Sequence, residues 1–171
     1  MTATNAPRKS FSYQMTVGKP PEEVFPLLCP VREYDWIELW DCKMIHSESG
    51  VAEYNAVFTT NFETEGLGIW TVSHYEPGKA IQFVVTHPGS HVKKLDISLE
   101  PAEEGCQLTW RHAYTAISSD GEAFVNLLDD SRYKTEMKYL ESCLTHYCDT
   151  GKMLKHGPGI AEMIRHHLKR K

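Results

Sequence analysis

The stretch CQLTWRHAYTAIS, residues 106–118, alternates strictly between two rows of side chains. An alternation with period two is typical of a β-strand that buries one of its faces. One row would carry Leu108, Trp110, His112, Tyr114 and Ala116. This row should face the interior, yet it contains an imidazole and a phenol. Either these groups form hydrogen bonds within the core, or the face borders a space in which a ligand binds.

Similar alternation recurs along the chain before this strand. A first strand is expected over residues 8–17, and residues 41–116 contain a run of strands separated by turn sequences such as EPGK (76–79) and HPGS (87–90). Including the first strand, the pattern predicts seven strands. All should be antiparallel, because every connection after residue 41 is short.

Three helices are expected around this sheet. The segment GKPPEEVFPLLCP (18–30) has the prolines and glutamates of a helix start, and VREYDWIEL (31–39) can form a second short helix. A long helix is expected from about residue 121 to about residue 150, although Asp129 and Asp130 interrupt its apolar pattern. The predicted fold class is α+β, with a curved seven-stranded sheet wrapped around the long C-terminal helix and two short helices after the first strand. One helix cannot fill such a concavity, so an internal cavity is expected.

Length and composition indicate one ordinary globular domain. The chain has 171 residues, of which 41% are hydrophobic and 24% are charged. The first ten residues lack the apolar stretch of a secretory signal, and no apolar run approaches the roughly 18 residues of a membrane span. The five cysteines are odd in number and scattered without CxxC spacing, so we interpret them as free thiols. These features predict a cytoplasmic protein.

The net charge of −5 conceals an asymmetry between the body and the tail. Residues 1–151 carry ten more acidic than basic side chains, whereas residues 152–171 carry five more basic than acidic ones. An acidic body argues against a nucleic-acid partner. The tail follows a Gly-Pro-Gly break with a weak basic amphipathic pattern. We interpret it as a short docked helix or a solvated end, with contact to an anionic membrane surface or to a protein partner as the alternatives.

Hairpin geometry predicts which side chains line the inner wall. Around the EPGK turn, His74 should pair with Ile81 and Trp70 with Val85, and the two later hairpins extend the same row. The predicted wall consists of Trp70, Val72, His74, Ile81, Phe83, Val85, Leu95, Ile97, Leu99, Leu108, Trp110, His112 and Tyr114. A mostly apolar wall with a few convergent polar groups is typical of a small-molecule site.

The arrangement also resembles the START/polyketide-cyclase (SRPBCC) superfamily, whose members have a helix-grip fold. The segments that carry the resemblance are PPEEVFPLLCPVREYDWIELWDCKMI (20–45), GLGIWTVSHYEPGKAIQFVVT (66–86) and LTWRHAYTAIS (108–118), followed by the long helix. The chain looks closest to the small bacterial single-domain members. The resemblance implies a ligand-binding domain over residues 1–151, followed by a basic C-terminal tail over residues 152–171. It also implies that an apolar small molecule or lipid binds between the sheet and the long helix, while some members of the family are cyclases or aromatases.

Three hypotheses for the function follow. In the first, Trp70, Phe83 and Trp110 bury an apolar or aromatic ligand, and His74, His112 and Tyr114 orient it. In the second, the protein is a cyclase-, aromatase- or dehydratase-like enzyme with His112 as general base and Tyr114 as a donor to an enolate or carbonyl oxygen. In the third, it is an interaction module whose core is filled by its own side chains. The first hypothesis is favoured, and the sequence makes no prediction of oligomeric state.

One pair of histidines raises the question of a metal. His87 and His91 flank the HPGS turn, where their rings could approach each other, and neutral imidazoles are good zinc ligands. No carboxylate or thiol is clearly placed to complete such a site. The chain also lacks GxSxG, HExxH and a glycine-rich phosphate loop. We therefore expect no metal and no cofactor.

Overall fold

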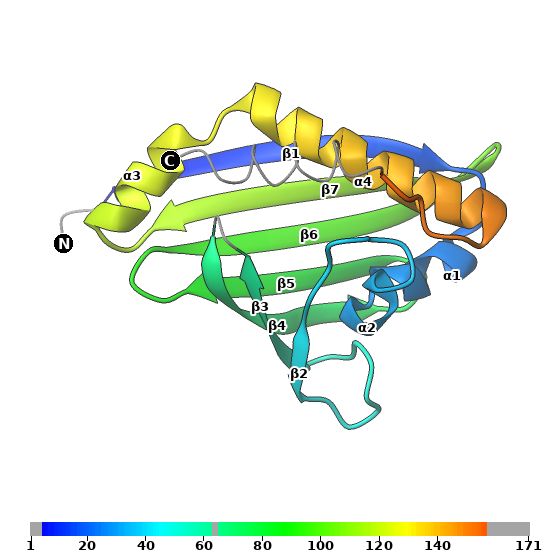
Figure 1. Ribbon diagram of the computed structural model, residues 1–171, viewed down its shortest axis with the longest axis horizontal. Helices are drawn as coiled ribbons and strands as arrows, with labels where there is room; N and C mark the ends of the chain where they lie inside the picture. Colours follow the sequence, from blue (N-terminus) through cyan, green and yellow to red (C-terminus); the bar gives the residue numbers. More distant parts are fainter. Residues whose placement is uncertain (1–4, 63–64, 157–171) are drawn as a thin grey trace.

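A computed structural model describes residues 5–62 and 65–156 of the chain. Seven strands form one antiparallel sheet in the order β1-β7-β6-β5-β4-β3-β2. Their bounds are β1 Arg8–Val17, β2 Lys43–His46, β3 Val57–Phe62, β4 Gly66–Glu76, β5 Ala80–His87, β6 His91–Ala102 and β7 Gly105–Ala116. Strands β2 to β7 pair in chain order, and β1 lies beside β7 (Figure 1). The predicted seven antiparallel strands are confirmed.

Most hairpin registers agree with the prediction. Phe83 pairs with Leu95 between β5 and β6, and Leu95 pairs with His112 between β6 and β7. We call the face that carries the buried side chains of the sheet the inner face. Its fully or nearly fully buried members include Val72, Ile81, Phe83, Val85, Leu95, Ile97, Leu99, Leu108 and Trp110. Period-two alternation therefore places twelve of the thirteen predicted wall residues on this face.

The exception is His74, because β4 loses its regular alternation near its C-terminal end. The register shifts between Val72 and His74, so that His74 lies opposite Gln82 and Tyr75 takes the place opposite Ile81. The side chain of His74 is 54% exposed. The prediction that His74 pairs with Ile81 on the inner face was wrong, since a β-bulge reverses the faces of the residues that follow it.

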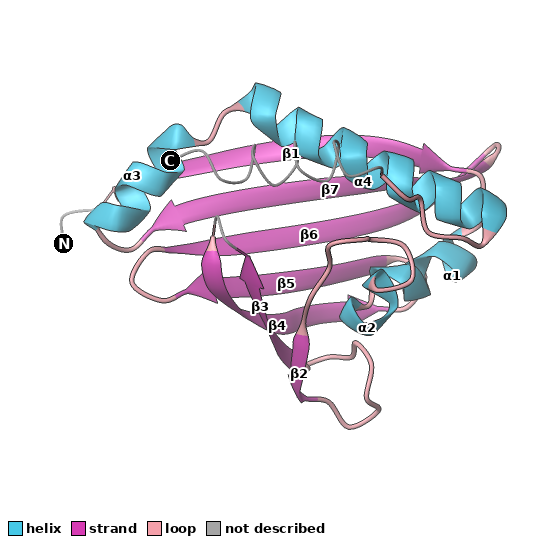
Figure 2. Cartoon of the chain, viewed as in Figure 1, coloured by secondary structure: helices cyan, strands magenta, loops and turns pink. Residues whose placement is uncertain are grey.

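Short helices close one end of the sheet, as predicted (Figure 2). The first predicted helix is divided into α1 (Pro21–Val24) and the 3-10 turn η1 (Phe25–Leu28), and the second is α2 (Pro30–Glu33). Each has a proline in its first turn, where the missing N–H is not needed. Trp36 follows α2 and is fully buried, with its indole N–H donating to the carbonyl of Leu27 at 2.9 Å.

The long C-terminal helix is broken into two helices. α3 spans Ser119–Leu127 and lies against β7 and β6, whereas α4 spans Asp130–Thr150 and runs beside β1 (Figure 1). The prediction of one helix from about residue 121 was wrong at this point. Asp129 is an N-cap: its carboxylate accepts a hydrogen bond from the backbone N–H of Arg132 at 2.8 Å and starts a new helix. α4 ends at Gly151, in the left-handed conformation with φ 68°, as predicted.

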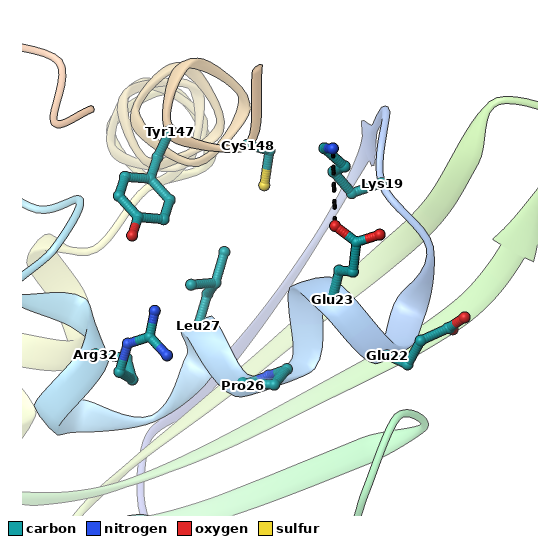
Figure 3. Close-up of a pocket in the computed structure, with 8 residues that line it drawn as sticks. All are labelled: Lys19, Glu22, Glu23, Pro26, Leu27, Arg32, Tyr147 and Cys148. Carbon is teal, nitrogen blue, oxygen red and sulfur yellow. Dashed lines mark ion pairs between the residues drawn. The ribbon is translucent and has the colours of Figure 1, made fainter. Parts of the chain in front are cut away.

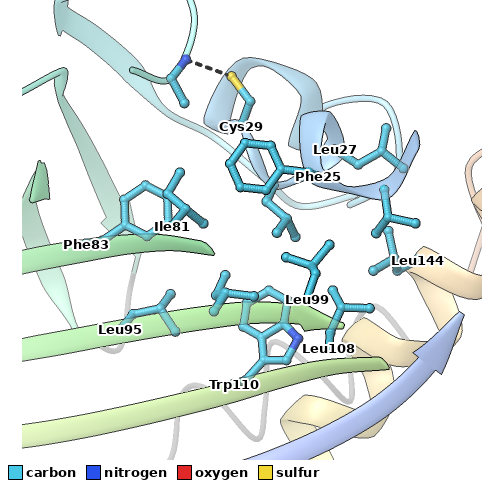
Figure 4. Packing of buried hydrophobic residues seen from close by; sticks show 14 of the residues in the cluster. Phe25, Leu27, Cys29, Ile81, Phe83, Leu95, Leu99, Leu108, Trp110 and Leu144 are labelled. Carbon is cyan, nitrogen blue, oxygen red and sulfur yellow. Dashed lines mark hydrogen bonds between the residues drawn. The ribbon is translucent and has the colours of Figure 1, made fainter. Parts of the chain in front are cut away.

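The core lies between the inner face and the helices. Phe25 and Leu27 from η1 and Leu144 from α4 belong to the same buried cluster as Trp110 and its neighbours on the sheet (Figure 4). All five cysteines are unpaired, as expected. Among the described residues, no helix has both the length and the apolar character needed to cross a membrane. Most of the predicted basic tail, residues 157–171, lies outside the described residues.

Candidate ligand site on the inner face

The apolar part of the inner wall is a cluster of aromatic rings on β3, β4, β5 and β7. Trp70 stacks on Phe58 with ring centroids 5.2 Å apart and meets Phe83 edge-on at 5.6 Å. The indole N–H of Trp70 donates to the Thr60 hydroxyl at 2.9 Å. Trp110 is 4% exposed, and its indole N–H has no partner among the described residues. The rings supply a large apolar surface that includes one buried, unpaired donor.

His112 is partly buried on β7 and connects the sheet to α4. Its ring is parallel to those of Trp110 and Tyr114, at 6.5 and 6.1 Å between centroids. Its Nδ1 atom lies 3.0 Å from the hydroxyl of Tyr133 on α4. Burial lowers the pKa of His112 to about 3 and raises that of Tyr133 above its usual value. Both groups are therefore neutral near pH 7 and share one hydrogen bond.

Tyr114 is 7% exposed and borders a narrow cleft at the junction of α3 and α4. The cleft has a volume of about 10 Å³, which is roughly the room of one water molecule. Arg132, Tyr133 and Glu136 line its α4 side. Burial raises the pKa of Tyr114 well above its usual value, so its phenol remains protonated.

A polar cluster of Glu65, His87, His91 and Lys93 adjoins Tyr114 at one end of the inner face. The Lys93 ammonium lies 2.7 Å from a carboxylate oxygen of Glu65. It also lies 5.1 Å from the ring centre of Trp70 and 5.9 Å from that of Tyr114. The Lys93 residue is only 7% exposed, so this charge is held among the rings of the wall.

The two histidines of this cluster lie face to face. Their rings are 4.2 Å apart and 15° from parallel, and His91 stacks with its other face on Phe124 of α3. His87 Nδ1 lies 3.0 Å from the backbone carbonyl of Glu65, and His91 Nδ1 lies 3.0 Å from the Ser90 hydroxyl. Both Nε2 atoms are buried without a partner among the described residues. Burial lowers both pKa values, that of His91 to about 4.

Glu65, His87 and His91 bring their ligand atoms within 4.8 Å of one another, as a metal site would require. The arrangement nevertheless does not fit a metal. Each imidazole must aim its in-plane lone pair at the ion, and two nearly parallel rings separated by 4.2 Å cannot share one target without turning. The ammonium of Lys93 already neutralises the carboxylate. We therefore treat these residues as a polar cluster organised around Lys93.

Five of the six predicted site residues meet on this wall. Trp70 and Tyr114 flank the Lys93 ammonium, Phe83 packs on Trp70, and Trp110 lies parallel to His112. The sixth, His74, lies on the other side of the sheet near Glu76. Sequence analysis did not include Glu65 or Lys93 in the site. The signal for Lys93 was its place in the alternating row, two residues from Leu95. Glu65 belongs to a loop, where no pattern places a side chain.

A wider cleft lies elsewhere, between α1, η1 and the last turn of α4 (Figure 3). It has a volume of about 340 Å³ and is lined by Leu27, Arg32 and Tyr147 together with the ion pair of Lys19 and Glu23. Neither this cleft nor the narrow one is lined by Trp70, Phe83 or Trp110. The predicted cavity against these rings therefore stays a prediction.

Comparison with known proteins supports this description of the fold. The family model for polyketide cyclases, dehydrases and lipid-transport proteins matches residues 8–139, most of the chain. The chain belongs to this family. The resemblance to the polyketide-cyclase family noted from the sequence is thereby confirmed. None of the curated proteins compared with the chain matches it.

Solved structures with a similar fold have low sequence identity to the chain. The ginseng major latex-like protein 151 from Panax ginseng has a TM-score of 0.61 at 11% identity, covering 82% of this chain and 97% of the other. SSP2350 from Staphylococcus saprophyticus has a TM-score of 0.56 at 20% identity, covering 87% and 98%. DynU16, a protein of the dynemicin biosynthetic locus, has 0.57 at 18%, covering 84% of this chain. The chain spans only 48% of DynU16. At these identities the likeness shows the helix-grip fold alone.

Proposed function

We propose that the protein binds an apolar or aromatic small molecule, or a lipid, against the inner face of its sheet. The supporting observation is that His87 Nε2, His91 Nε2 and Trp110 Nε1 are buried without hydrogen-bond partners among the described residues. Buried polar groups in proteins are nearly always paired, and each unpaired group costs about 1–3 kcal/mol. Three such groups beside an aromatic wall suit a site whose remaining partners come from a ligand.

In this function the rings and the polar groups have different roles. Trp70, Phe83 and Trp110 would supply most of the affinity, at about 25 cal/mol per Å² of apolar surface removed from water. His112 and Tyr114 would fix the orientation of the ligand. His74 takes no part, because its side chain is exposed on the opposite side of the sheet.

The function is tested by recovering and measuring a ligand. Native mass spectrometry of the purified protein should show added mass, and extraction should identify the molecule. Replacing Trp110→Phe keeps the ring but removes the N–H, and should weaken an acceptor-bearing ligand by about five- to a hundredfold. The matched control is His74→Gln on the other side of the sheet, which should leave the affinity for the ligand unchanged. If the measured mass is that of the protein alone, and neither fatty acids nor polycyclic aromatics raise its melting temperature, the results would instead support an interaction module with a filled core.

A second candidate function is a cyclase- or dehydratase-like reaction, which the contact between His112 and Tyr133 favours. A neutral imidazole next to a phenol suits the transfer of one proton. The hydroxyl within bonding distance of His112 is that of Tyr133, whereas the Tyr114 ring lies parallel to the imidazole at 6.1 Å. With the molecule identified by extraction, His112→Gln should abolish turnover and preserve affinity if the protein is an enzyme. The same change should alter affinity alone if the protein only binds.

A further inference from the structure

The ion pair at the end of the aromatic wall bears on the charge of the ligand. The side chains of Lys93 and Glu65 are 9% and 20% exposed, and their charged atoms are 2.7 Å apart. The ammonium is also held between the rings of Trp70 and Tyr114. Its positive charge is therefore already balanced, on the same surface that the ligand would contact. A buried charge of this kind is stable only while its partner remains in place.

His87, which lies beside the pair, adds a hydrogen-bond acceptor. The Glu65 carbonyl can only accept, so His87 Nδ1 carries the hydrogen that it donates across 3.0 Å. His87 Nε2 consequently carries a lone pair, and it lies 3.4 Å from the Glu65 carboxylate, which is another acceptor. Neither atom can donate to the other while the imidazole is neutral. A group with an O–H or N–H would satisfy the unpaired His87 Nε2, whereas a second carboxylate would not.

We propose that Glu65, His87, His91 and Lys93 form a selectivity cluster for apolar ligands whose polar end is an uncharged hydrogen-bond donor, such as a phenolic hydroxyl. This inference rests on the ligand-binding function proposed above. An incoming carboxylate meets the Glu65 carboxylate and an imidazole lone pair, and it gains Lys93 only by displacing Glu65 into a poorly solvated place. A hydroxyl donor finds an unpaired acceptor and leaves the ion pair intact. The cluster therefore accepts phenols and alcohols and excludes acids.

Three probes that share the naphthalene ring system test whether the cluster selects ligands with an uncharged hydrogen-bond donor. Binding of 2-naphthol, naphthalene and 2-naphthoate is measured at pH 7.5 by calorimetry and by tryptophan emission. We expect 2-naphthol to bind at least about tenfold more tightly than either of the other two. A 2-naphthoate affinity equal to or greater than that of 2-naphthol overturns the selection and leaves the ligand-binding function standing. If none of the three probes binds, the proposed selection is overturned, and the ligand-binding function is decided by the mass-spectrometric test above.

Charge-removal variants show whether the ion pair causes the selection. Glu65→Gln leaves the Lys93 charge unbalanced, so the affinity ratio of 2-naphthoate to 2-naphthol should rise about tenfold or more. Lys93→Met leaves Glu65 unbalanced and should instead favour 2-naphthylmethylammonium. Unchanged probe ratios in either variant overturn the inference.

The chain offers a matched control for these variants. Glu76 and Lys79 form an ion pair of the same length, 2.7 Å, but both side chains are exposed. Glu76→Gln should therefore leave every probe ratio unchanged. The double variant Glu65→Gln/Lys93→Met removes both buried charges at once, which preserves the fold better than removing one. The double variant should bind 2-naphthoate more weakly than the Glu65→Gln variant does. If the two variants bind 2-naphthoate equally well, the Lys93 charge does not attract the carboxylate.

Discussion

The Nδ1 atom of His112 lies 3.0 Å from the hydroxyl of Tyr133, and this hydrogen bond joins β7 to α4. The Tyr133 ring also stacks on Phe11 of β1, with centroids 5.0 Å apart. One side chain of α4 therefore fixes the helix against two strands and gives the buried imidazole a partner. These contacts give Tyr133 a structural role between the sheet and α4.

Replacing Tyr133→Phe should destabilise the protein by about 1–3 kcal/mol. The change keeps the ring stacked on Phe11 but leaves His112 Nδ1 buried without its partner. Urea unfolding at pH 7 measures the free energy of unfolding. Tyr54→Phe is the control, because Tyr54 is 63% exposed and should change that free energy by less than about 0.5 kcal/mol. Equal stabilities of the two variants would show that the hydrogen bond contributes nothing.

Mild acid should destabilise the fold through its buried histidines. Burial lowers the pKa of His91 to about 4, whereas an exposed histidine titrates near 6.5. Between these values the unfolded chain binds a proton that the folded chain does not bind. The free energy of unfolding should therefore fall as the pH falls from about 6.5 to about 4, by roughly 3 kcal/mol from His91. The groups that act on this titration are His87, Glu65 and Lys93.

The Glu65 carboxylate acts on the free energy of unfolding mainly below this pH range. Burial alone would raise the pKa of Glu65, but the charge of Lys93 lowers it to about 2. Its contribution is present above the unfolded value near 4.5 and is lost only as the pH falls toward 2. Urea unfolding at pH 7, 6, 5 and 4 separates the two effects. His91→Phe, which can retain the stack on Phe124, should reduce the slope between pH 6.5 and 4 by the share of His91, and the buried His87 and His112 account for the rest.

The inner face was largely predictable from the sequence, whereas the polar cluster was not. Period-two alternation is a direct consequence of strand geometry, so it placed Phe83, Trp110 and His112 correctly. The same row contained Lys93, but a lysine is normally expected to be exposed, and its partner Glu65 comes from a loop. Alternation also failed at His74, because nothing in the local pattern marks the bulge.

The break in the C-terminal helix had a visible signal of its own. Asp129 interrupts the apolar pattern and is also a preferred N-cap residue, which is the role it has in the structure. The break turns α4 relative to α3 and brings Tyr133 to His112. A single continuous helix gives no reason to pair these two residues. The partner of His112 therefore depended on a local event that helical periodicity does not encode.

The packing of α3 on the β5–β6 turn should make Gly121 sensitive to the smallest substitution. A Cβ atom at Gly121 would lie 1.7 Å from the backbone carbonyl oxygen of Ser90, so α3 would have to move away from the turn. In an unobstructed helix, Gly→Ala stabilises by about 1 kcal/mol. Here we expect Gly121→Ala to destabilise by about 1–3 kcal/mol and to loosen the stack of Phe124 on His91.

Urea unfolding of Gly121→Ala, compared with Gly151→Ala, tests this packing. Gly151 has φ 68° with no other atom within 4 Å of an added Cβ, so alanine there meets only backbone strain, at a cost of about 1 kcal/mol. Loosening of α3 should also accelerate hydrogen exchange at the β5–β6 turn in Gly121→Ala and leave it unchanged in Gly151→Ala. A Gly121→Ala protein at least as stable as the parent would mean that α3 does not press on Ser90, and that the cover of His91 is looser than its buried ring indicates.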